Sequence, residues 1–337
     1  MEKLYNTAYH ITDLSESNYL ITGGAGFIGS NLVEYLLRYG AKKVRVLDNL
    51  SNGQYANIEE FESYENFEFI EGDIRDIEVC KKALEGIDYV SHQAALGSVP
   101  RSISDPITSH EVNITGFLNL LDSVRKSPTV KRMVYAASSS TYGDNEDLPK
   151  IEGREGNPLS PYAVTKAVNE MYADVYSKVY GLHTIGLRYF NVFGPKQNPN
   201  NPYAAVIPIF CKAFIGHQRP SINGDGETSR DFTFVENVIQ ANIKSLCYVG
   251  LSKHEVYNIA CGDKTSLNDV IEILGNISGR DIKPIYGPKR EGDIKHSMAN
   301  ISKSKDQLGY IPTVNFRDGL NKVYNYYFDE IHNVNNH

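Results

Sequence analysis

Short apolar runs alternate with longer amphipathic stretches through the first 190 residues of the chain. The short runs predict strands, and the stretches in which apolar residues recur every three or four positions predict helices. The predicted strands are 19–22, 44–48, 67–71, 89–93, 132–137 and 184–188, and the predicted helices are 28–39, 77–84, 113–126 and 162–180. This alternation predicts an α/β fold, a Rossmann-like doubly wound parallel sheet with helices on both faces.

The character of the chain changes after Phe190, where prolines interrupt a loop-rich region with only short regular pieces. We therefore expect a cofactor-binding Rossmann domain over residues 1–190 and a smaller α/β substrate-binding domain over residues 191–337. A strand-like run at 256–260 can return to the first sheet, so this boundary is not expected to be clean. Residues 1–18 are too polar and too weakly periodic to assign.

Composition excludes several classes of protein. With 337 residues, of which 41% are hydrophobic and 22% charged, the chain can bury a sizeable core and is not expected to be disordered. A formal net charge of −7 and the lack of a basic stripe disfavour nucleic-acid binding. No apolar run suits a membrane span or a signal peptide, so we expect a cytoplasmic protein. Scattered cysteines and histidines predict neither a disulfide framework nor a metal site.

A glycine-rich loop follows the first predicted strand. Gly23, Gly26 and Gly29 have the spacing GxxGxxG directly before a predicted helix. Glycines there permit a tight turn and close approach of the backbone to a pyrophosphate, and the helix N-terminus offers unpaired N–H groups to it. Asp48 ends the next strand about 20 residues later, where a carboxylate binds ribose hydroxyls and repels a 2′-phosphate. Together these features predict NAD rather than NADP, although Asp48 alone is equally an acidic residue that caps a loop.

Tyr162 and Lys166 stand four residues apart at the start of a predicted helix, after Ser160 as N-cap and Pro161 as first helical residue. This spacing places both side chains on one helical face. An ammonium there, with the positive nicotinamide ring nearby, is expected to favour the phenolate and bring the pKa of Tyr162 toward that of a useful general base. A serine cluster, 138–140, follows an earlier predicted strand, and ligands bind at the carboxyl ends of the strands in such folds. The YxxxK pair alone is often a surface pair, but this ordered combination of motifs is specific.

At this point the chain resembles the extended short-chain dehydrogenase/reductase family, and within it the nucleotide-sugar 4-epimerases. The resemblance covers nearly the whole chain after residue 18 and rests on GGAGFIG, LDNLSNG, GDIRD, QAALGSVPRS, AASSSTYG, SPYAVTK, LRYFNVFGP, GDGETSRDF and REGD. It implies a catalytic triad in which Tyr162 is the base for the sugar 4-OH, Ser138 holds that oxygen and Lys166 orients the nicotinamide ribose. Hydride then passes from C4 to NAD and returns to the other face of a 4-keto sugar.

The resemblance also implies two sets of binding residues. The expected cofactor contacts are Gly23, Gly26, Phe27, Ile28, Gly29, Asp48, Asn49, Asp73, Ile74, Gln93, Tyr162 and Lys166. The expected contacts of the UDP-sugar are Ser139, Ser140, Asn191, Gln197, Arg230, Arg290, Asp293 and Ser297. Two arginines suit a pyrophosphate clamp because a guanidinium makes planar, charge-assisted hydrogen bonds, although either alone is equally a solvated surface charge. For Asp73, forming the turn in GDIRD is an alternative to contacting the adenine.

Two positions bear on the reaction and on the sugar. Relatives that dehydrate or decarboxylate carry an acid within the serine motif, whereas Thr141 and the serines before it favour an epimerase. In glucose-restricted relatives the fourth residue after the REGD aspartate is a bulky Tyr, and Ser297 here leaves room for an N-acetyl group. UDP-N-acetylglucosamine and UDP-N-acetylgalactosamine are therefore the expected pair. UDP-glucose/UDP-galactose and UDP-N-acetylhexosaminuronate stay as alternatives, and Arg101 is a candidate partner for a uronate carboxylate.

Two further expectations concern the role and assembly of the chain. A non-catalytic NAD-sensing module on the same fold is an alternative, but such a protein has no need of Ser138, Tyr162 and Lys166. Related proteins pair the helices equivalent to 113–126 and 162–180 across a two-fold axis, and both carry apolar residues on more than one face, as at Phe117, Leu118, Leu120 and Leu121. Burial against their own sheet explains part of that apolarity. We expect a homodimer.

Overall fold

Seven parallel strands form the central sheet of the computed structural model, which describes residues 4–199, 205–250, 253–289 and 295–334. The strand order is β11-β6-β5-β4-β1-β2-β3, so the chain reverses its direction of travel across the sheet between β1 and β4. The strands are β1 (Asn18–Thr22), β2 (Lys43–Asp48), β3 (Phe67–Glu71), β4 (Tyr89–His92), β5 (Arg132–Ser138), β6 (Thr184–Tyr189) and β11 (Glu255–Ile259). This sheet confirms the predicted doubly wound α/β class.

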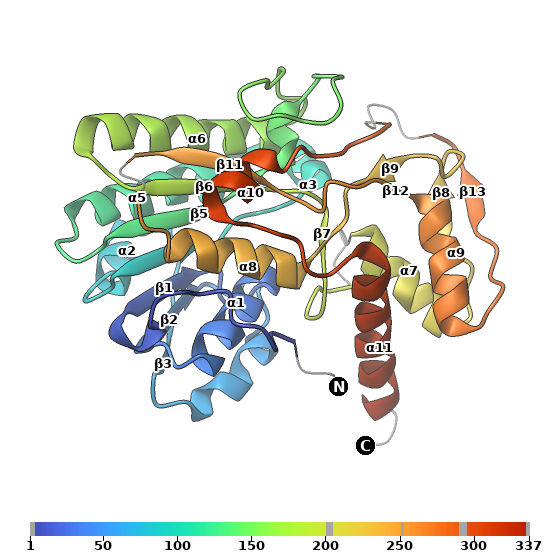
Figure 1. Cartoon of the computed structure of the whole chain (residues 1–337), viewed down its shortest axis with the longest axis horizontal. Helices are drawn as coiled ribbons and strands as arrows, with labels where there is room; N and C mark the ends of the chain where they lie inside the picture. Colours follow the sequence, from blue (N-terminus) through green and yellow to red (C-terminus); the bar gives the residue numbers. More distant parts are fainter. Residues whose placement is uncertain (1–3, 200–204, 251–252, 290–294, 335–337) are drawn as a thin grey trace.

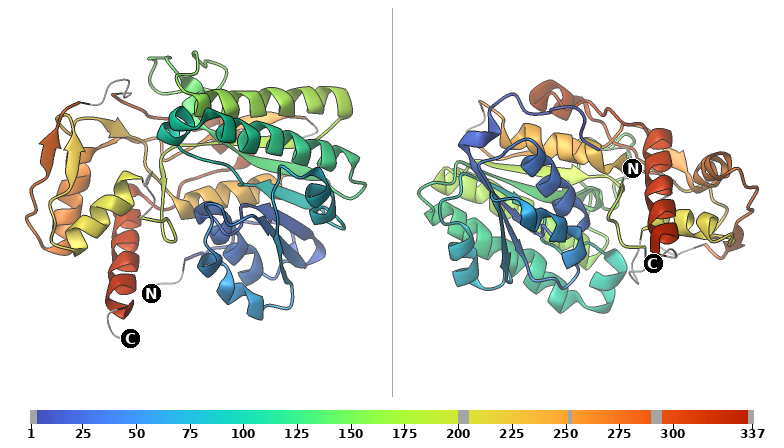
Figure 2. Two further views of the ribbon diagram at one scale, coloured as in Figure 1. Left: turned by 180° about the vertical axis from the view of Figure 1, so that it is seen from behind. Right: turned by 90° about the horizontal axis from the view of Figure 1, so that it is seen from below.

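Helices cover both faces of the sheet (Figure 1, Figure 2). One buried cluster includes side chains of α1 (Phe27–Arg38) and α8 (Val235–Leu246), and a second includes side chains of α2 (Ile77–Ala83), α5 (Phe117–Lys126) and α6 (Pro161–Tyr180). Short helical segments complete this part: η1 (Leu14–Glu16), η2 (Tyr55–Asn57), η3 (Glu59–Ser63), α3 (Val99–Ser104), α4 (Pro106–His110), η4 (Glu111–Gly116) and η5 (Ser139–Tyr142). The predicted helix at 113–126 thus begins inside a π-helical turn, η4, that leads into α5.

The rest of the chain builds a smaller part beside the carboxyl ends of the strands (Figure 1). Its helices are α7 (Val206–Ile215), α9 (Leu267–Ser278), α10 (Ser302–Leu308) and α11 (Phe316–Val334). Three two-stranded sheets pair β7 (Val192–Phe193) with β10 (Thr233–Phe234), β8 (Ser221–Asn223) with β13 (Ile285–Gly287), and β9 (Ser229–Arg230) with β12 (Thr265–Ser266). Both β11 and α8 come from sequence after residue 190 yet pack with the central sheet, so the two parts exchange segments.

The N-terminal segment, unassigned from sequence, is held against α1 by buried tyrosines. The Tyr5 hydroxyl donates to Asn31 Oδ1 (2.6 Å), and the Tyr9 ring stacks on Tyr35 with the centroids 5.8 Å apart. The Tyr9 hydroxyl donates to Glu236 Oε1 on α8 (2.8 Å). These contacts follow no helix or strand period, which explains why the hydrophobic pattern did not show them. Within the described ranges, no helix is long and apolar enough to cross a membrane.

Candidate active site

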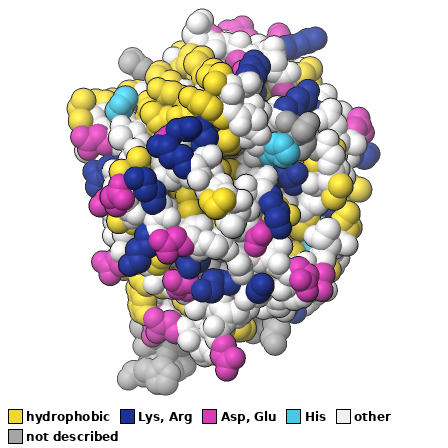
Figure 3. Space-filling view, turned by 90° about the vertical axis from the view of Figure 1, so that its left-hand side faces the viewer, with side chains coloured by type: hydrophobic (Ala, Val, Ile, Leu, Met, Phe, Trp, Pro, Cys, Tyr) yellow, Lys and Arg dark blue, Asp and Glu magenta, His cyan; other side chains and the backbone are white. Residues whose placement is uncertain are grey.

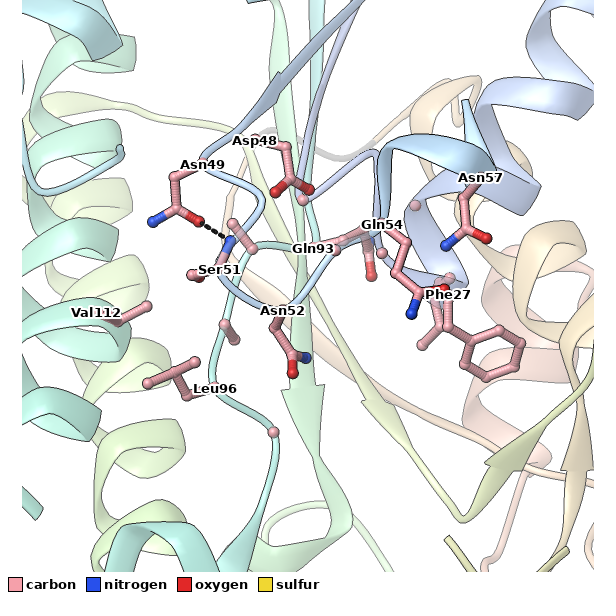
Figure 4. A pocket seen from close by; sticks show the side chains of 18 of the residues that line it. Phe27, Asp48, Asn49, Ser51, Asn52, Gln54, Asn57, Gln93, Leu96 and Val112 are labelled. Carbon is pink, nitrogen blue, oxygen red and sulfur yellow. Dashed lines mark hydrogen bonds between the residues drawn. The ribbon is translucent and has the colours of Figure 1, made fainter. Parts of the chain in front are cut away.

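A cavity of about 340 Å³ lies where loops leave the carboxyl ends of β1, β2, β3 and β4. Figure 4 shows side chains arranged around it, with Asp48 at the carboxyl end of β2, Asn49 directly after it and Leu96 beyond β4. The residues expected to contact a cofactor and found in its lining are Gly23, Gly26, Phe27, Ile28, Gly29, Asp48, Asn49, Asp73, Ile74 and Gln93. The structure therefore gathers around one cavity residues that are spread over the first 93 positions of the chain.

The glycine loop brings the backbone close to itself and to the neighbouring strand. A Cβ on Gly29 would lie 2.1 Å from the Gly23 carbonyl oxygen, and one on Gly23 would lie 2.6 Å from Ala94 N. Gly23 also has φ +69°, a conformation that side chains disfavour. Helix α1 begins directly after Gly26, which as N-cap supplies no side-chain hydrogen bond to the first-turn N–H groups. This cradle and the positive end of the helix fit a pyrophosphate.

Two carboxylates define the far end of the cavity. Asp48 is buried and accepts backbone N–H groups from Ala25 (3.0 Å) and Leu50 (2.9 Å); burial raises the pKa of its carboxyl, and these bonds oppose the rise. Asp73 accepts from Asn49 Nδ2 (2.8 Å), and its hydrogen bonds with Arg75 hold its pKa at about 2. Asp73 also accepts the Arg75 backbone N–H, so it forms the turn as well as lining the cavity.

Ser138, Tyr162 and Lys166 lie at the carboxyl end of β5 and are not among the residues that line the cavity. The α6 helix starts as the sequence predicts: the Ser160 hydroxyl accepts the Ala163 N–H (3.1 Å), and Pro161 is the first helical residue. The Ser138 hydroxyl lies close enough to the Tyr162 hydroxyl to lower its pKa. The structure thus places a tyrosine, a serine and a lysine together at the carboxyl ends of the strands, where ligands bind in such folds.

Burial dominates the electrostatics of Tyr162 and Lys166 in the structure. Burial raises the pKa of the Tyr162 hydroxyl, and the nearby Ser138 hydroxyl only partly opposes this. The Lys166 ammonium donates to the Ala136 carbonyl oxygen (2.7 Å) and lies 5.9 Å from the centre of the Tyr162 ring. Burial also lowers the pKa of Lys166 to about 8, against the opposing charge of Glu170. Four-residue spacing put both side chains on one face, but it could not predict how strongly that face is desolvated.

The sequence pattern did not identify the residues that hold in place the face of α6 with Tyr162 and Lys166. Arg188 on β6 is buried and pairs with Glu170 Oε2 on α6 (2.6 Å) and Glu155 Oε1 (2.5 Å). The Ser102 hydroxyl accepts the Tyr162 N–H (3.0 Å) from α3. Because these partners come from separate elements, only the fold brings them together; the four-residue spacing of Lys166 and Glu170 was the one local signal.

The residues expected to bind the sugar nucleotide are more scattered. Ser140 donates to Ser138 Oγ (2.9 Å) and lies with Ser139 in η5. Asn191 is exposed with φ 29°. Gln197 lines the cavity, where its Nε2 donates to the Val192 carbonyl (3.3 Å) and its buried Oε1 has no hydrogen-bond partner.

Arg230 and Ser297 are brought together by β9. The Ser297 N–H donates to the Ser229 carbonyl oxygen (3.2 Å), and Arg230 Nη1 donates to the same oxygen (2.9 Å). Arg290 and Asp293 lie outside the described residues. Arg101 donates to Asn52 Oδ1 (3.2 Å), and both residues line the cavity that contains the glycine loop. In the part of the chain that the structure describes, no cluster of three His, Cys, Asp or Glu side chains could hold a metal ion.

Comparison with known proteins gives one family and several solved relatives. Residues 20–323 match the family described as GDP-mannose 4,6 dehydratase. A UDP-N-acetylglucosamine 4-epimerase from Methanobrevibacter ruminantium M1, in complex with UDP-N-acetylmuramic acid, is 38% identical with a TM-score of 0.88. A UDP-glucose 4-epimerase from Thermotoga maritima with UDP-glucose is 35% identical with a TM-score of 0.87. A UDP-glucuronic acid 4-epimerase from Bacillus cereus with UDP-glucuronic acid and NAD is 32% identical with a TM-score of 0.86. Each alignment covers 93% of this chain and 99% of the other.

Proposed function

We propose that this protein interconverts UDP-N-acetylglucosamine and UDP-N-acetylgalactosamine. The chain belongs to the extended short-chain dehydrogenase/reductase family, whose model it matches over residues 20–323. Together with its similarity to the solved epimerases, this makes it an NAD-dependent UDP-sugar 4-epimerase. The observation that carries the choice of sugar is the small side chain of Ser297, half-buried next to β9 and Arg230. A small residue there leaves space for the acetamido group at C2.

The cavity residues fit NAD. The Gly23–Gly29 cradle and the start of α1 would hold the pyrophosphate, and Asp48 would bind the adenosine ribose. A second phosphate on that ribose would face a buried carboxylate, which disfavours NADP. When bound, NAD supplies the hydride acceptor and donor for the sugar C4.

The triad residues supply the proton chemistry in this proposal. Tyr162 takes the proton of the sugar 4-OH as C4 is oxidised and returns it when the 4-keto sugar is reduced from its other face. Ser138, whose hydroxyl lies near that of Tyr162, holds the reacting oxygen. Lys166, anchored on the Ala136 carbonyl, keeps a positive charge in a buried site near Tyr162 and so favours the phenolate that takes the proton. Since burial raises the pKa of Tyr162, loss of its proton depends on nearby positive charge, which Lys166 supplies and which the nicotinamide ring of NAD would add when bound.

Gln197 supports the acetylated sugar. Its buried Oε1 is an acceptor without a partner, and an unpaired buried acceptor costs free energy. An acetamido N–H is a donor that can pair with it. The hydroxyls of Ser139 and Ser140, which directly follow Ser138 in η5, are further polar groups that could bind the acetamido group.

Turnover of separate sugars tests this proposal. The purified protein is incubated with UDP-N-acetylglucosamine, UDP-glucose or UDP-N-acetylglucosaminuronate, and the 4-epimers are separated by chromatography. We expect the acetylated neutral sugar to have the highest kcat/KM. Efficient epimerisation of UDP-glucose with no turnover of acetylated sugars contradicts the proposed substrate, and a preference for the uronate supports the alternative that involves Arg101.

We also propose a homodimer formed through α6. Three apolar side chains one turn apart along α6 are exposed, Met171 (65%), Val175 (51%) and Val179 (63%). Hydrophobic side chains gather near the top of the face drawn in Figure 3, at the level where α6 lies in Figure 1. Of the residues that first indicated this interface, Phe117, Leu120 and Leu121 are instead buried within the subunit.

Light scattering at micromolar concentration tests the assembly. We expect a dimer mass for the wild-type chain and a monomer mass for Val175→Arg, because a charge cannot be buried unpaired at an apolar interface. Lys178→Glu, an exposed change on the same helix, is the control. A monomeric wild-type chain contradicts the proposal.

A further inference from the structure

Asp231 is a buried carboxylate that the proposed reaction does not use. It directly follows Arg230 and is 1% exposed. Its Oδ1 accepts the backbone N–H of Cys261 (2.9 Å), and its Oδ2 accepts those of Gly262 (3.0 Å) and Ala299 (3.2 Å). One side chain therefore satisfies three N–H groups from two separate segments.

These two segments belong to different parts of the molecule. Cys261 and Gly262 leave the carboxyl end of β11, the edge strand of the central sheet. Ala299 lies two residues after Ser297, in the segment that runs alongside β9. Asp231 thus connects the segment that carries Ser297 to the central sheet.

A second buried side chain, the amide of Asn258, continues the connection to the serine motif. Asn258 on β11 donates to the carbonyl oxygens of Lys150 (3.0 Å) and Asn300 (3.1 Å). Its Oδ1 accepts the hydroxyl of Tyr142 (2.7 Å), the last residue of η5. The segment 297–300 is therefore held at Ala299 by Asp231 and at Asn300 by Asn258, which also contacts the element that follows Ser138.

A buried carboxylate is a costly way to hold a loop. Burial raises the pKa of the Asp231 carboxyl to about 6, although its three N–H bonds oppose the rise. A neutral side chain avoids the cost of burying a charge but leaves at least one of those N–H groups without an acceptor. The arrangement therefore holds the two segments in a fixed geometry, at the cost in folding free energy of burying a carboxylate.

We propose that Asp231 is a positioning residue for the sugar-nucleotide site: it fixes segment 297–300, with Ser297, against the central sheet that carries the catalytic triad. The proposal deepens the proposed function and rests on it for the role of Ser297 and Arg230. Asp231 itself contacts neither the cofactor cavity nor the triad among the contacts described.

Asp231→Asn is the test, with Asp263→Asn as the matched control. Both remove one negative charge, but Asp263 is exposed and lies in the loop just after Gly262. Amide hydrogen exchange is followed in peptides that contain 260–262 and 297–300, and the affinity for UDP is measured by calorimetry. Asp231→Asn should speed exchange in both peptides and weaken UDP binding about ten-fold or more, since a charge-assisted bond is lost. Bound NAD should be unchanged, and Asp263→Asn should match the wild type.

Two results overturn the proposal: unchanged exchange in segment 297–300, or a UDP affinity equal to that of Asp263→Asn. If the wild-type chain binds no UDP, the proposed substrate class is wrong, while the exchange measurement still decides whether Asp231 holds the segment. If Asp231→Asn does not fold, Asp231→Glu replaces it, because the extra methylene displaces the carboxylate while keeping its charge. The same two outcomes then apply.

Discussion

The cofactor half and the sugar half of the site are built in different ways. The cofactor cavity is formed largely by loops at the carboxyl ends of neighbouring parallel strands, and much of its expected chemistry is that of the backbone in the glycine loop. The sugar half joins segments far apart in sequence through buried side chains, as Asp231 joins Gly262 to Ala299. Local spacing can specify a site made by backbone, whereas a site made by long-range side-chain contacts needs the whole fold.

The largest expected effect comes from Tyr162→Phe, which removes the proposed base where the two halves meet. We expect kcat to fall by about 10²- to 10⁴-fold, the usual contribution of a positioned acid–base group. NAD content, read from the absorbance of the protein after heat release, should not change. Tyr180→Phe, at the exposed end of the same helix, is the control. Full activity of Tyr162→Phe would support a catalytically silent, NAD-sensing role.

Gly29→Ala tests the backbone-built half. The new Cβ would lie 2.1 Å from the Gly23 carbonyl oxygen, so the loop cannot keep its conformation. We expect the purified variant to lose most of its bound NAD while its far-UV circular dichroism stays that of a folded α/β protein. In Gly287→Ala the nearest atom is 3.8 Å away, which is ordinary contact, and NAD content should be that of the wild type. Normal NAD content in Gly29→Ala would show that the cradle is not the cofactor site.

The same contrast explains how much of the molecule the sequence predicted. The fold class and the start of α6 were predicted because strand periodicity, Ser160 and Pro161 act locally. The residues around the cavity came from the glycine spacing, the strand-end Asp48 and the family resemblance.

What could not be predicted depends on burial and on long-range partners. Tyr5 and Tyr9 pack on α1 without any periodic pattern. The direction of the pKa shift of Tyr162 follows from desolvation of a face that spacing alone leaves undefined. Asp231 looked like part of a motif because it follows Arg230, but its partners lie some 30 to 70 residues further along the chain.

Ser297→Tyr sharpens the comparison on the sugar side. A phenol ring there should fill the space proposed for the acetamido group and lower kcat/KM for UDP-N-acetylglucosamine by roughly 10- to 100-fold, the scale of an overpacking penalty. UDP-glucose turnover and NAD content should change little, because UDP-glucose has only a hydroxyl at C2. Ser297→Ala keeps the space and should retain turnover of the acetylated sugar. Equal losses on both sugars would mean that Ser297 does not select the C2 substituent.

Lowering the pH should decrease the free energy of unfolding through His92, beside the cofactor half, and increase it through Asp231, beside the proposed sugar half. His92, buried on β4 beside Thr22 Oγ1 (2.7 Å), has its pKa lowered from 6.5 to about 3, mainly by burial and further by the charge of Lys166. Below pH 6.5 the unfolded chain binds a proton that the folded chain does not, so the free energy of unfolding falls as the pH drops toward 3. Asp231 has its pKa raised from 3.8 to about 6, so the folded chain takes up its proton first and gains stability over that window.

The smallest predicted effects measure this balance. Between about pH 7.5 and about pH 5, the free energy of unfolding of His92→Gln should fall by roughly 2 kcal/mol less than that of the wild type. Over the same range, the free energy of unfolding of Asp231→Asn should fall by roughly 1 kcal/mol more than that of the wild type. Urea unfolding of both variants and the wild type at the two pH values provides the measurement. Equal acid sensitivity of all three chains would show that neither buried group titrates as its surroundings require. Opposite shifts would show that acid destabilises the chain through His92 and stabilises it through Asp231, the residue proposed to hold segment 297–300.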